Sequence, residues 1–150
     1  MYVKTKKLTP EAILPTKNNE FDAGFDLYNL EDVEIPTGIP VKIKTGIAIE
    51  IPEGYVGLIW PRSGLGSKGI QVLGGVIDST YRGELIVCLI NNRHGDTINE
   101  IFNSVFTAKL EAGSKIAQLL IQPVLQCGLV EVDELSETSR GNKGFGSSGV

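Results

Sequence analysis

Apolar and polar residues alternate with a period of two along most of this chain, most clearly at residues 3–7 and 39–51. Such alternation is typical of β-strands that cover one face. The second of these stretches is interrupted at Thr45-Gly46, where we expect a break between two strands. We therefore predict strands at residues 3–7, 23–28, 39–44, 47–51, 55–60, 85–90 and 116–121, and one or two helical turns near residues 63–68.

Three of the predicted strands, at 55–60, 85–90 and 116–121, are apolar on both faces. Many short strands separated by Gly and Pro predict an all-β sandwich, jelly roll or barrel. A strand that is apolar on both faces needs cover on both. The domain core supplies one cover, and a partner subunit or the interior of a sandwich supplies the other. Both alternatives are open from the pattern alone.

Length and charge narrow the class of protein. A chain of 150 residues suits one domain. The net charge of −4 argues against a protein that coats nucleic acid. The chain has no run of 18 apolar residues and no signal-peptide core, so we expect no membrane segment and a soluble, cytoplasmic protein. One His and two Cys are too few for a standard zinc site.

The polar stretch 75–85 lies between two apolar runs, 70–77 and 85–90. This arrangement predicts a β-hairpin that holds Asp78 and Tyr81 in a fixed relation. The alternative is a solvated turn in which Asp78 bonds its own backbone. The hairpin becomes a candidate site only if other residues converge on the same chemistry.

Several other residues suit an anionic ligand. Arg62, Ser63 and Gly64 follow an apolar strand and offer a guanidinium, a hydroxyl and backbone N–H groups, although a polar turn with a helix cap explains them equally well. Gln118 lies inside an apolar strand, where a buried amide needs a structural bond or a ligand. The glycine-rich tail from residue 136 is either a disordered end or an arm that closes over an anion. Arg140 and Lys143 in this tail add further donors for an anion. Asp26 and Asp78 are carboxylates that could serve a metal ion and a water. Together these residues fit a triphosphate bound with Mg²⁺.

Five segments together resemble, in order, the five motifs of the trimeric all-β dUTPase family. The resemblance implies a jelly-roll-like distorted β-barrel of short strands, assembled as a homotrimer with shared active sites. We expect a single β-domain at 1–138 and a flexible C-terminal segment at 139–150 that closes over the site. The segments are Ala23–Tyr28, Pro61–Gly64, Gly75–Glu84, Gly113–Pro123 and Arg140–Gly149.

The resemblance also implies a reaction and its residues. The reaction is hydrolysis of dUTP to dUMP and pyrophosphate, by Mg²⁺-assisted attack of an Asp78-activated water on the α-phosphorus. Asp26 reaches Mg²⁺ through water, and Tyr81 packs on the deoxyribose. Phe145 stacks on uracil, and Arg140 contacts the γ-phosphate. The other implied substrate-binding residues are Arg62, Ser63, Gly64, Gly75, Val76, Ile77, Gln118, Gly146 and Ser147.

The chain departs from the family pattern at several positions, and none of them removes a group with an implied role. Thr80 stands where an acid or amide is common, Ser114-Lys115 replaces an acid–arginine pair, and Lys143 and Ser148 differ in the last motif. Residues 96–103 look like an insertion and are a possible contact surface for a protein partner. Two other functions stay open: a dCTP deaminase of the same fold, and a binding protein switched by nucleotide.

Overall fold

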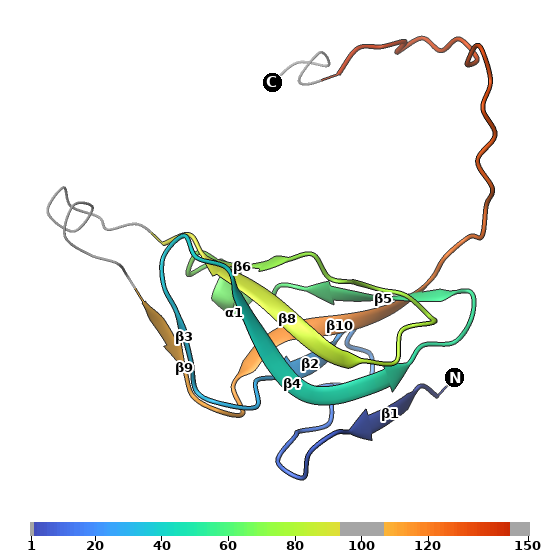
Figure 1. Ribbon diagram of the computed structural model, residues 1–150. Coiled ribbons are helices and arrows are strands. Elements are labelled where there is room, and N and C mark those ends of the chain that lie inside the picture. Colours follow the sequence, from blue (N-terminus) through green and yellow to red (C-terminus); the bar gives the residue numbers. More distant parts are fainter. Residues whose placement is uncertain (1, 94–106, 145–150) are drawn as a thin grey trace, which may run out of the picture.

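The computed structural model describes residues 2–93 and 107–144 (Figure 1). The candidate partner surface at 96–103 and the predicted site residues Phe145, Gly146 and Ser147 lie outside the described residues.

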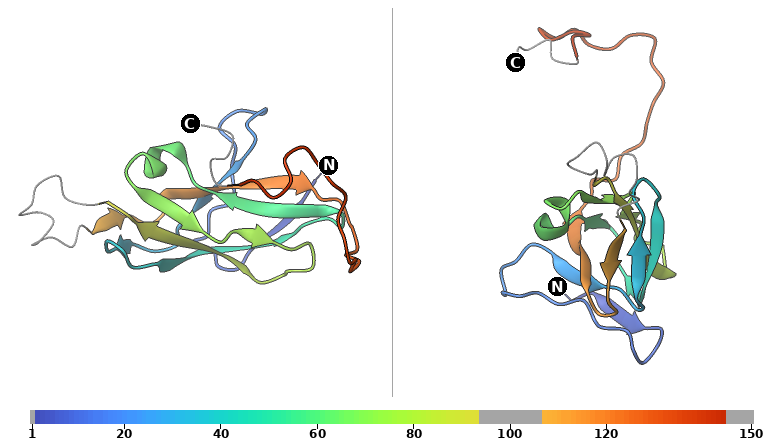
Figure 2. Two further views of the ribbon diagram at one scale, coloured as in Figure 1. Left: turned by 90° about the horizontal axis from the view of Figure 1, so that it is seen from above. Right: turned by 90° about the vertical axis from the view of Figure 1, so that its left-hand side faces the viewer.

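Two four-stranded antiparallel sheets form the body of the protein, and Figure 2 shows them as two layers. Between the layers lies one apolar core, which includes Leu27, Ile43, Ile59, Val87 and Leu119. The prediction of an all-β fold is confirmed. The first sheet has the order β1 (Lys4–Lys7), β4 (Val41–Glu50), β8 (Glu84–Asn91), β6 (Ile70–Leu73). The second has the order β2 (Phe25–Tyr28), β10 (Lys115–Pro123), β5 (Tyr55–Trp60), β7 (Val76–Ile77), and the small additions are β3 (Val33–Ile35), β9 (Ala108–Leu110) and α1 (Ser63–Gly66).

β4 is one strand, so the predicted break at Thr45-Gly46 is wrong. Its pairing with β8 shifts register between Lys44 and Ala48, which marks a β-bulge. Gly46 has a φ of 68°, a conformation that glycine adopts without steric cost. The chain therefore passes through the polar residues by bulging and stays in the sheet.

The Thr45 hydroxyl and the Gly46 N–H in the bulge are both bonded to neighbours. Thr45 is 1% exposed, and its hydroxyl donates to the Leu85 carbonyl at 2.7 Å. The same hydroxyl accepts the Ile47 N–H at 3.2 Å. The Gly46 N–H donates to Oε1 of Glu84 at 2.7 Å. The bulge thus ties the middle of β4 to the start of β8.

The predicted hairpin over residues 70–90 is only partly correct. β6 pairs with β8 as expected, and its last pair is Leu73 with Cys88. β7 instead leaves this sheet and pairs with β5, with Ile77 opposite Gly57. Between them, Gly74 and Gly75 have φ values of 71° and 110°, which let the chain turn from one sheet to the other. The turn with Asp78 therefore connects the two sheets.

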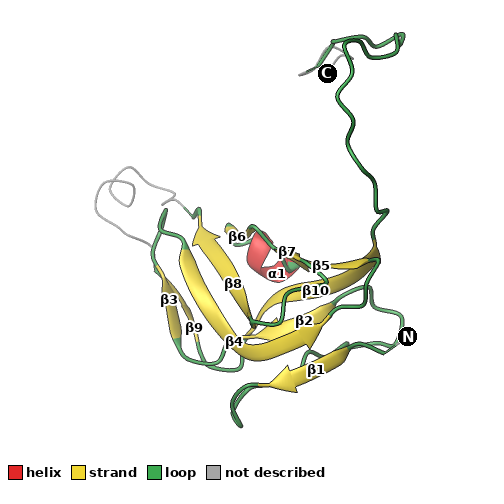
Figure 3. Cartoon of the chain, turned by 45° about the vertical axis from the view of Figure 1, so that its right-hand side comes forward, coloured by secondary structure: helices red, strands yellow, loops and turns green. Residues whose placement is uncertain are grey.

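Residues 124–144 leave the body after β10 and carry no strand of their own (Figures 1 and 3). Their apolar side chains are exposed, with Leu129 at 100% and Leu135 at 88%. The predicted domain boundary at residue 138 stays a prediction, because residues 124–138 are exposed among the described parts of the chain. We call residues 124–144 the C-terminal arm. Within the described ranges, no helix has the length and apolar content needed to cross a bilayer.

Candidate functional site

The second sheet brings four predicted site residues to one end of its strands. In the register of the central strand β10, Gln118 pairs with Asp26 of β2 on one side and with Trp60 of β5 on the other. Arg62 and Ser63 follow directly after β5, where the chain turns into α1. Cross-strand neighbours lie close enough for their side chains to touch. The predicted grouping of these four polar residues therefore follows from strand register.

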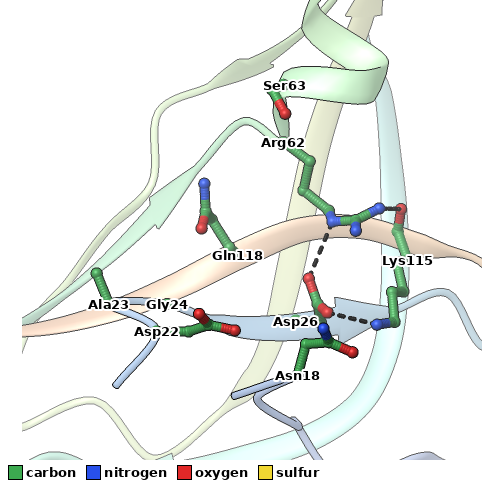
Figure 4. Close-up of a pocket in the computed structure, with 9 residues that line it drawn as sticks. All are labelled: Asn18, Asp22, Ala23, Gly24, Asp26, Arg62, Ser63, Lys115 and Gln118. Carbon is green, nitrogen blue, oxygen red and sulfur yellow. Dashed lines mark hydrogen bonds and ion pairs between the residues drawn. The ribbon is translucent and has the colours of Figure 1, made fainter. Parts of the chain in front are cut away.

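Their side chains line a polar cavity of about 500 Å³, which we call the anion pocket (Figure 4). It contains two cationic groups, two carboxylates, two amides and a hydroxyl. The lining residues are Asn18, Asp22, Ala23, Gly24, Asp26, Arg62, Ser63, Lys115 and Gln118.

Asp26 is held between two cations in this pocket (Figure 4). Its Oδ1 lies 2.9 Å from Nε of Arg62, and its Oδ2 lies 2.7 Å from Nζ of Lys115. Arg62 also donates from Nη1 to the Lys115 carbonyl at 3.3 Å. The hydrogen bond to Asp26 raises the pKa of Lys115, against a smaller lowering by desolvation. Lys115 is therefore charged at neutral pH.

Gln118 is half-buried at the wall of the pocket, so the expectation of a buried amide needs correction. Its Nε2 donates to the Pro61 carbonyl at 2.9 Å. A Cβ at Gly24 would lie 2.6 Å from Oε1 of Gln118, so only glycine leaves room for this amide. Gln118 thus makes a structural bond and still faces the pocket.

Asp78 and Tyr81 line a second cavity of about 220 Å³ with Val76, Ile77, Glu84 and Ile86. Tyr81 is 42% exposed, and its hydroxyl donates to the Glu84 carbonyl at 2.9 Å. Among the described residues, the Asp78 carboxylate has no hydrogen-bond or ion-pair partner. We call this cavity the turn pocket.

The two pockets lie at opposite ends of β5. β7 runs antiparallel to β5 with Ile77 opposite Gly57, so the same register puts Asp78 level with Val56. Arg62 lies six residues after Val56 in the sequence. Six residues of extended strand span roughly 20 Å. The structure therefore does not bring Asp78 and Arg62 of one chain together.

The remaining predicted residues contribute backbone or lie in the C-terminal arm. The Gly75 carbonyl accepts the Ile59 N–H at 2.8 Å, which fixes the start of β7. Gly64 lies in α1. Arg140 and Lys143 are exposed in the C-terminal arm, where Nε of Arg140 donates to the Lys143 carbonyl at 3.0 Å. They contact neither pocket of this chain.

Sequence reasoning gave no role to four polar residues that line these pockets: Asn18, Asp22, Lys115 and Glu84. Lys115 stands at the first position of an apolar strand, where a lysine is typical of a solvated strand end. In the sequence, Lys115 stands out only because Ser114-Lys115 replaces the acid–arginine pair of the family pattern. Its contact with Asp26 joins residues far apart in the sequence, so spacing gives no signal for it.

Neither pocket offers a complete protein cage for a metal ion. Within residues 2–93 and 107–144, no group of three or more His, Cys, Asp or Glu side chains is placed to hold one. Asp26 accepts two contacts, whereas a carboxylate has about four lone-pair sites. Its remaining sites suit the water of a hydrated cation, which fits the Mg²⁺ expected through water. Mg²⁺ characteristically keeps several waters and takes phosphate oxygens from a substrate.

A family model described as dUTPase matches residues 10–149. The deoxyuridine 5′-triphosphate nucleotidohydrolase of Nautilia profundicola is 48% identical, over 99% of each chain. The protein of that name from Paramecium bursaria Chlorella virus 1 is 42% identical, over 97% of this chain and 96% of its own.

Solved structures are similar over the same range. A mutant dUTPase of Staphylococcus bacteriophage 80alpha with dUpNHpp superposes with a TM-score of 0.86, at 35% identity over 99% of both chains. A mutant dUTPase of phage phi11 of S. aureus, described with the coordination of a structural Mg(II) ion, gives 0.76 at 31% identity over 89% of this chain and 98% of its own.

Proposed function

The chain belongs to the dUTPase family, and from this membership we propose that it is an enzyme that hydrolyses dUTP to dUMP and pyrophosphate. The observation that carries the proposal is the anion pocket, where Arg62, Ser63 and Gln118 converge beside Asp26. Guanidinium, hydroxyl and amide donors that converge on one cavity suit a row of phosphates.

We propose Asp78 as the general base. Its carboxylate stands on a turn fixed at both ends by strands and is free of protein partners among the described residues. It takes a proton from water as the water oxygen bonds to the α-phosphorus. The bond from that phosphorus to the oxygen of the β-phosphate breaks, and pyrophosphate leaves. General-base catalysis of this kind contributes roughly 10²–10⁴-fold.

Tyr81 is proposed to select the deoxy sugar. Its hydroxyl bond to Glu84 holds the ring at the edge of the turn pocket. A flat ring fixed against the sugar leaves no space for a 2′-hydroxyl. The backbone of residues 75–77 is proposed to read the uracil edge, because it lies next to the same pocket.

We propose that Mg²⁺ is held by the substrate phosphates and reaches Asp26 through water. When bound, the ion neutralises charge on the triphosphate. Asp26 would orient a bound water through its free lone pairs. Arg62 would bind the phosphates directly, while Ser63 and Gln118 would fix their orientation.

The active form is proposed to be a homotrimer with shared sites. Support comes from the roughly 20 Å between Asp78 and Arg62, since a reaction that needs both must take them from different copies. Support also comes from the exposed apolar residues of the C-terminal arm and the half-buried outer face of β8. Arg140 and residues 145–147 are proposed to complete a site on another copy.

The test is pyrophosphate release from dUTP, UTP, dTTP and dCTP, measured side by side with Mg²⁺. We expect turnover of dUTP in clear excess over the other three. Asp78→Asn should bind dUpNHpp as the wild type does and lose most of that turnover. Near-normal turnover of Asp78→Asn would contradict the proposed base, and ammonia release from dCTP would instead favour a deaminase.

A further inference from the structure

Lys115 is connected to Arg62 by two routes. One runs through side chains, from Nζ of Lys115 to Oδ2 of Asp26 at 2.7 Å and from Oδ1 of Asp26 to Nε of Arg62 at 2.9 Å. The other is the bond from Nη1 of Arg62 to the Lys115 carbonyl at 3.3 Å. The two routes close a ring that fixes the plane of the guanidinium (Figure 4).

The ring leaves part of Arg62 available to a ligand. A guanidinium carries five N–H groups, and the contacts to Asp26 and to the Lys115 carbonyl are made from Nε and Nη1. Asp26 is well covered, with 15% of its side chain exposed, whereas 34% of the Arg62 side chain is exposed and lines the anion pocket. Asp26 is therefore the fixed member of the pair, and the orientation of Arg62 depends on how Asp26 binds it.

Carboxylates and guanidinium groups pair most strongly as a fork, in which two N–H groups meet two oxygens. Here Nε of Arg62 meets Oδ1 and the ammonium of Lys115 meets Oδ2, where its positive charge disfavours a second guanidinium N–H. Without that charge, Oδ2 would attract a second guanidinium N–H. Arg62 would then turn onto Asp26 and lose donors that face the pocket.

We propose that Lys115 is a positioning residue for phosphate binding, which acts by occupying Oδ2 of Asp26 and so keeps the Arg62 donors free. This rests on the proposed function, because the phosphates are those of dUTP. Lys115 need not touch the substrate in this role. Any side chain that supplies a cation at the same place should serve, which predicts rescue by arginine.

The experiment compares Lys115→Met and Lys115→Arg with wild type in the full-length protein. Affinity for dUpNHpp and for dUMP is measured by calorimetry with Mg²⁺, after thermal unfolding has verified that each variant is folded. We expect Lys115→Met to bind dUpNHpp about tenfold more weakly, the scale of one charge-assisted hydrogen bond, with little change for dUMP. Lys115→Arg should bind both ligands nearly as wild type does.

Lys109→Met is the matched control, because it breaks another lysine–carboxylate pair at 2.6 Å, between β9 and β3, that lines neither pocket. It should bind both ligands as wild type does. An equal loss for dUMP and dUpNHpp in Lys115→Met, or no loss for either, would overturn the positioning role.

A double-mutant cycle distinguishes positioning from direct contact. If Lys115 acts through Asp26, Lys115→Met should cost nothing further once Asp26→Asn is present. An undiminished effect in that background would mean that Lys115 meets the phosphates itself, which would overturn the proposal. If the wild-type protein neither bound dUpNHpp nor released pyrophosphate, both the proposed function and the role of Lys115 would be contradicted. If the wild type did both and Lys115→Met bound dUpNHpp equally well, only the role of Lys115 would be contradicted.

Discussion

At the scale of single residues, the position of the Tyr81 ring depends on Gly83. A Cβ at Gly83 would lie 2.6 Å from Cζ and 3.0 Å from Cε2 of Tyr81, and closer still to the hydroxyl. The ring therefore lies against the backbone of its own turn. Its orientation is set before any ligand arrives, which is the condition for strong discrimination at a small site.

Gly83→Ala should push the ring away from the turn and weaken sugar selection. Because Gly83 lies on an exposed turn, the fold should survive. We expect the ratio of kcat/KM for dUTP over UTP to fall by roughly tenfold, the scale that one methyl-sized change sets in a specificity pocket.

Steady-state pyrophosphate release with both nucleotides measures this ratio. Gly66→Ala is the control, since a Cβ there meets nothing within 4 Å. An unchanged ratio in Gly83→Ala would mean that Tyr81 takes its orientation from another contact.

Residues also differ in how visible they are in the sequence. Arg62 and Gln118 could be singled out as candidate ligand-binding residues from the sequence. Arg62 is a cation directly after an apolar strand, and Gln118 is an amide within one. Lys115 looks like an ordinary strand end, and its importance comes from a carboxylate on another strand. Local chemistry can be predicted from sequence, whereas a partner chosen by register cannot.

At the scale of elements, the bulge in β4 and the departure of β7 shape the turn that carries Asp78. Period-two alternation located β1 and both halves of β4, but it treated Thr45-Gly46 as an end and gave no sign of β3 or β9. The alternation cannot reveal that a threonine hydroxyl replaces the missing backbone bonds. It also cannot reveal which sheet a two-residue strand joins, because β7 is too short to have a pattern.

Thr45→Val should destabilise the protein while keeping its shape. The change leaves the Leu85 carbonyl and the Ile47 N–H without their partner in a buried site. We expect the free energy of unfolding to fall by about 1–3 kcal/mol, the cost of unsatisfied buried polar groups.

Urea unfolding at one fixed protein concentration measures this cost, because assembly contributes to apparent stability. Thr5→Val on the exposed strand β1 provides the same chemical change without burial and should leave the free energy of unfolding nearly unchanged. Equal effects of the two substitutions would show that the bulge bonds contribute nothing.

At the scale of the whole molecule, the C-terminal arm has two parts with different compositions. Residues 124–135 carry exposed apolar side chains, among them Leu125 at 87% and Val130 at 83%. The part from residue 136 onward is rich in glycine and serine and carries Arg140 and Lys143. The first part suits burial against another copy, and the second suits a lid over a ligand.

Two truncations should separate these roles. A chain that ends at Ser139 should stay folded and assembled but lose most turnover of dUTP, because it lacks Arg140 and Phe145. A chain that ends at Pro123 should also lose assembly, since it lacks the apolar residues.

Sedimentation, melting temperature and pyrophosphate release are measured on both truncations and on the full chain. Full activity of the chain that ends at Ser139 would show that the last residues are no lid. Normal assembly of the chain that ends at Pro123 would place the subunit contacts elsewhere.

The separation of the two pockets along β5 has a genetic consequence: two inactive alleles should complement each other. Arg62→Ala and Asp78→Asn each remove one half of every site in their own assemblies. When the two chains are unfolded and refolded together, some sites in the mixed assemblies receive an intact Arg62 from one chain and an intact Asp78 from the other. The mixture should then release pyrophosphate from dUTP although neither variant does so alone. If one chain supplied both groups, every site would carry a defect and mixing would restore nothing.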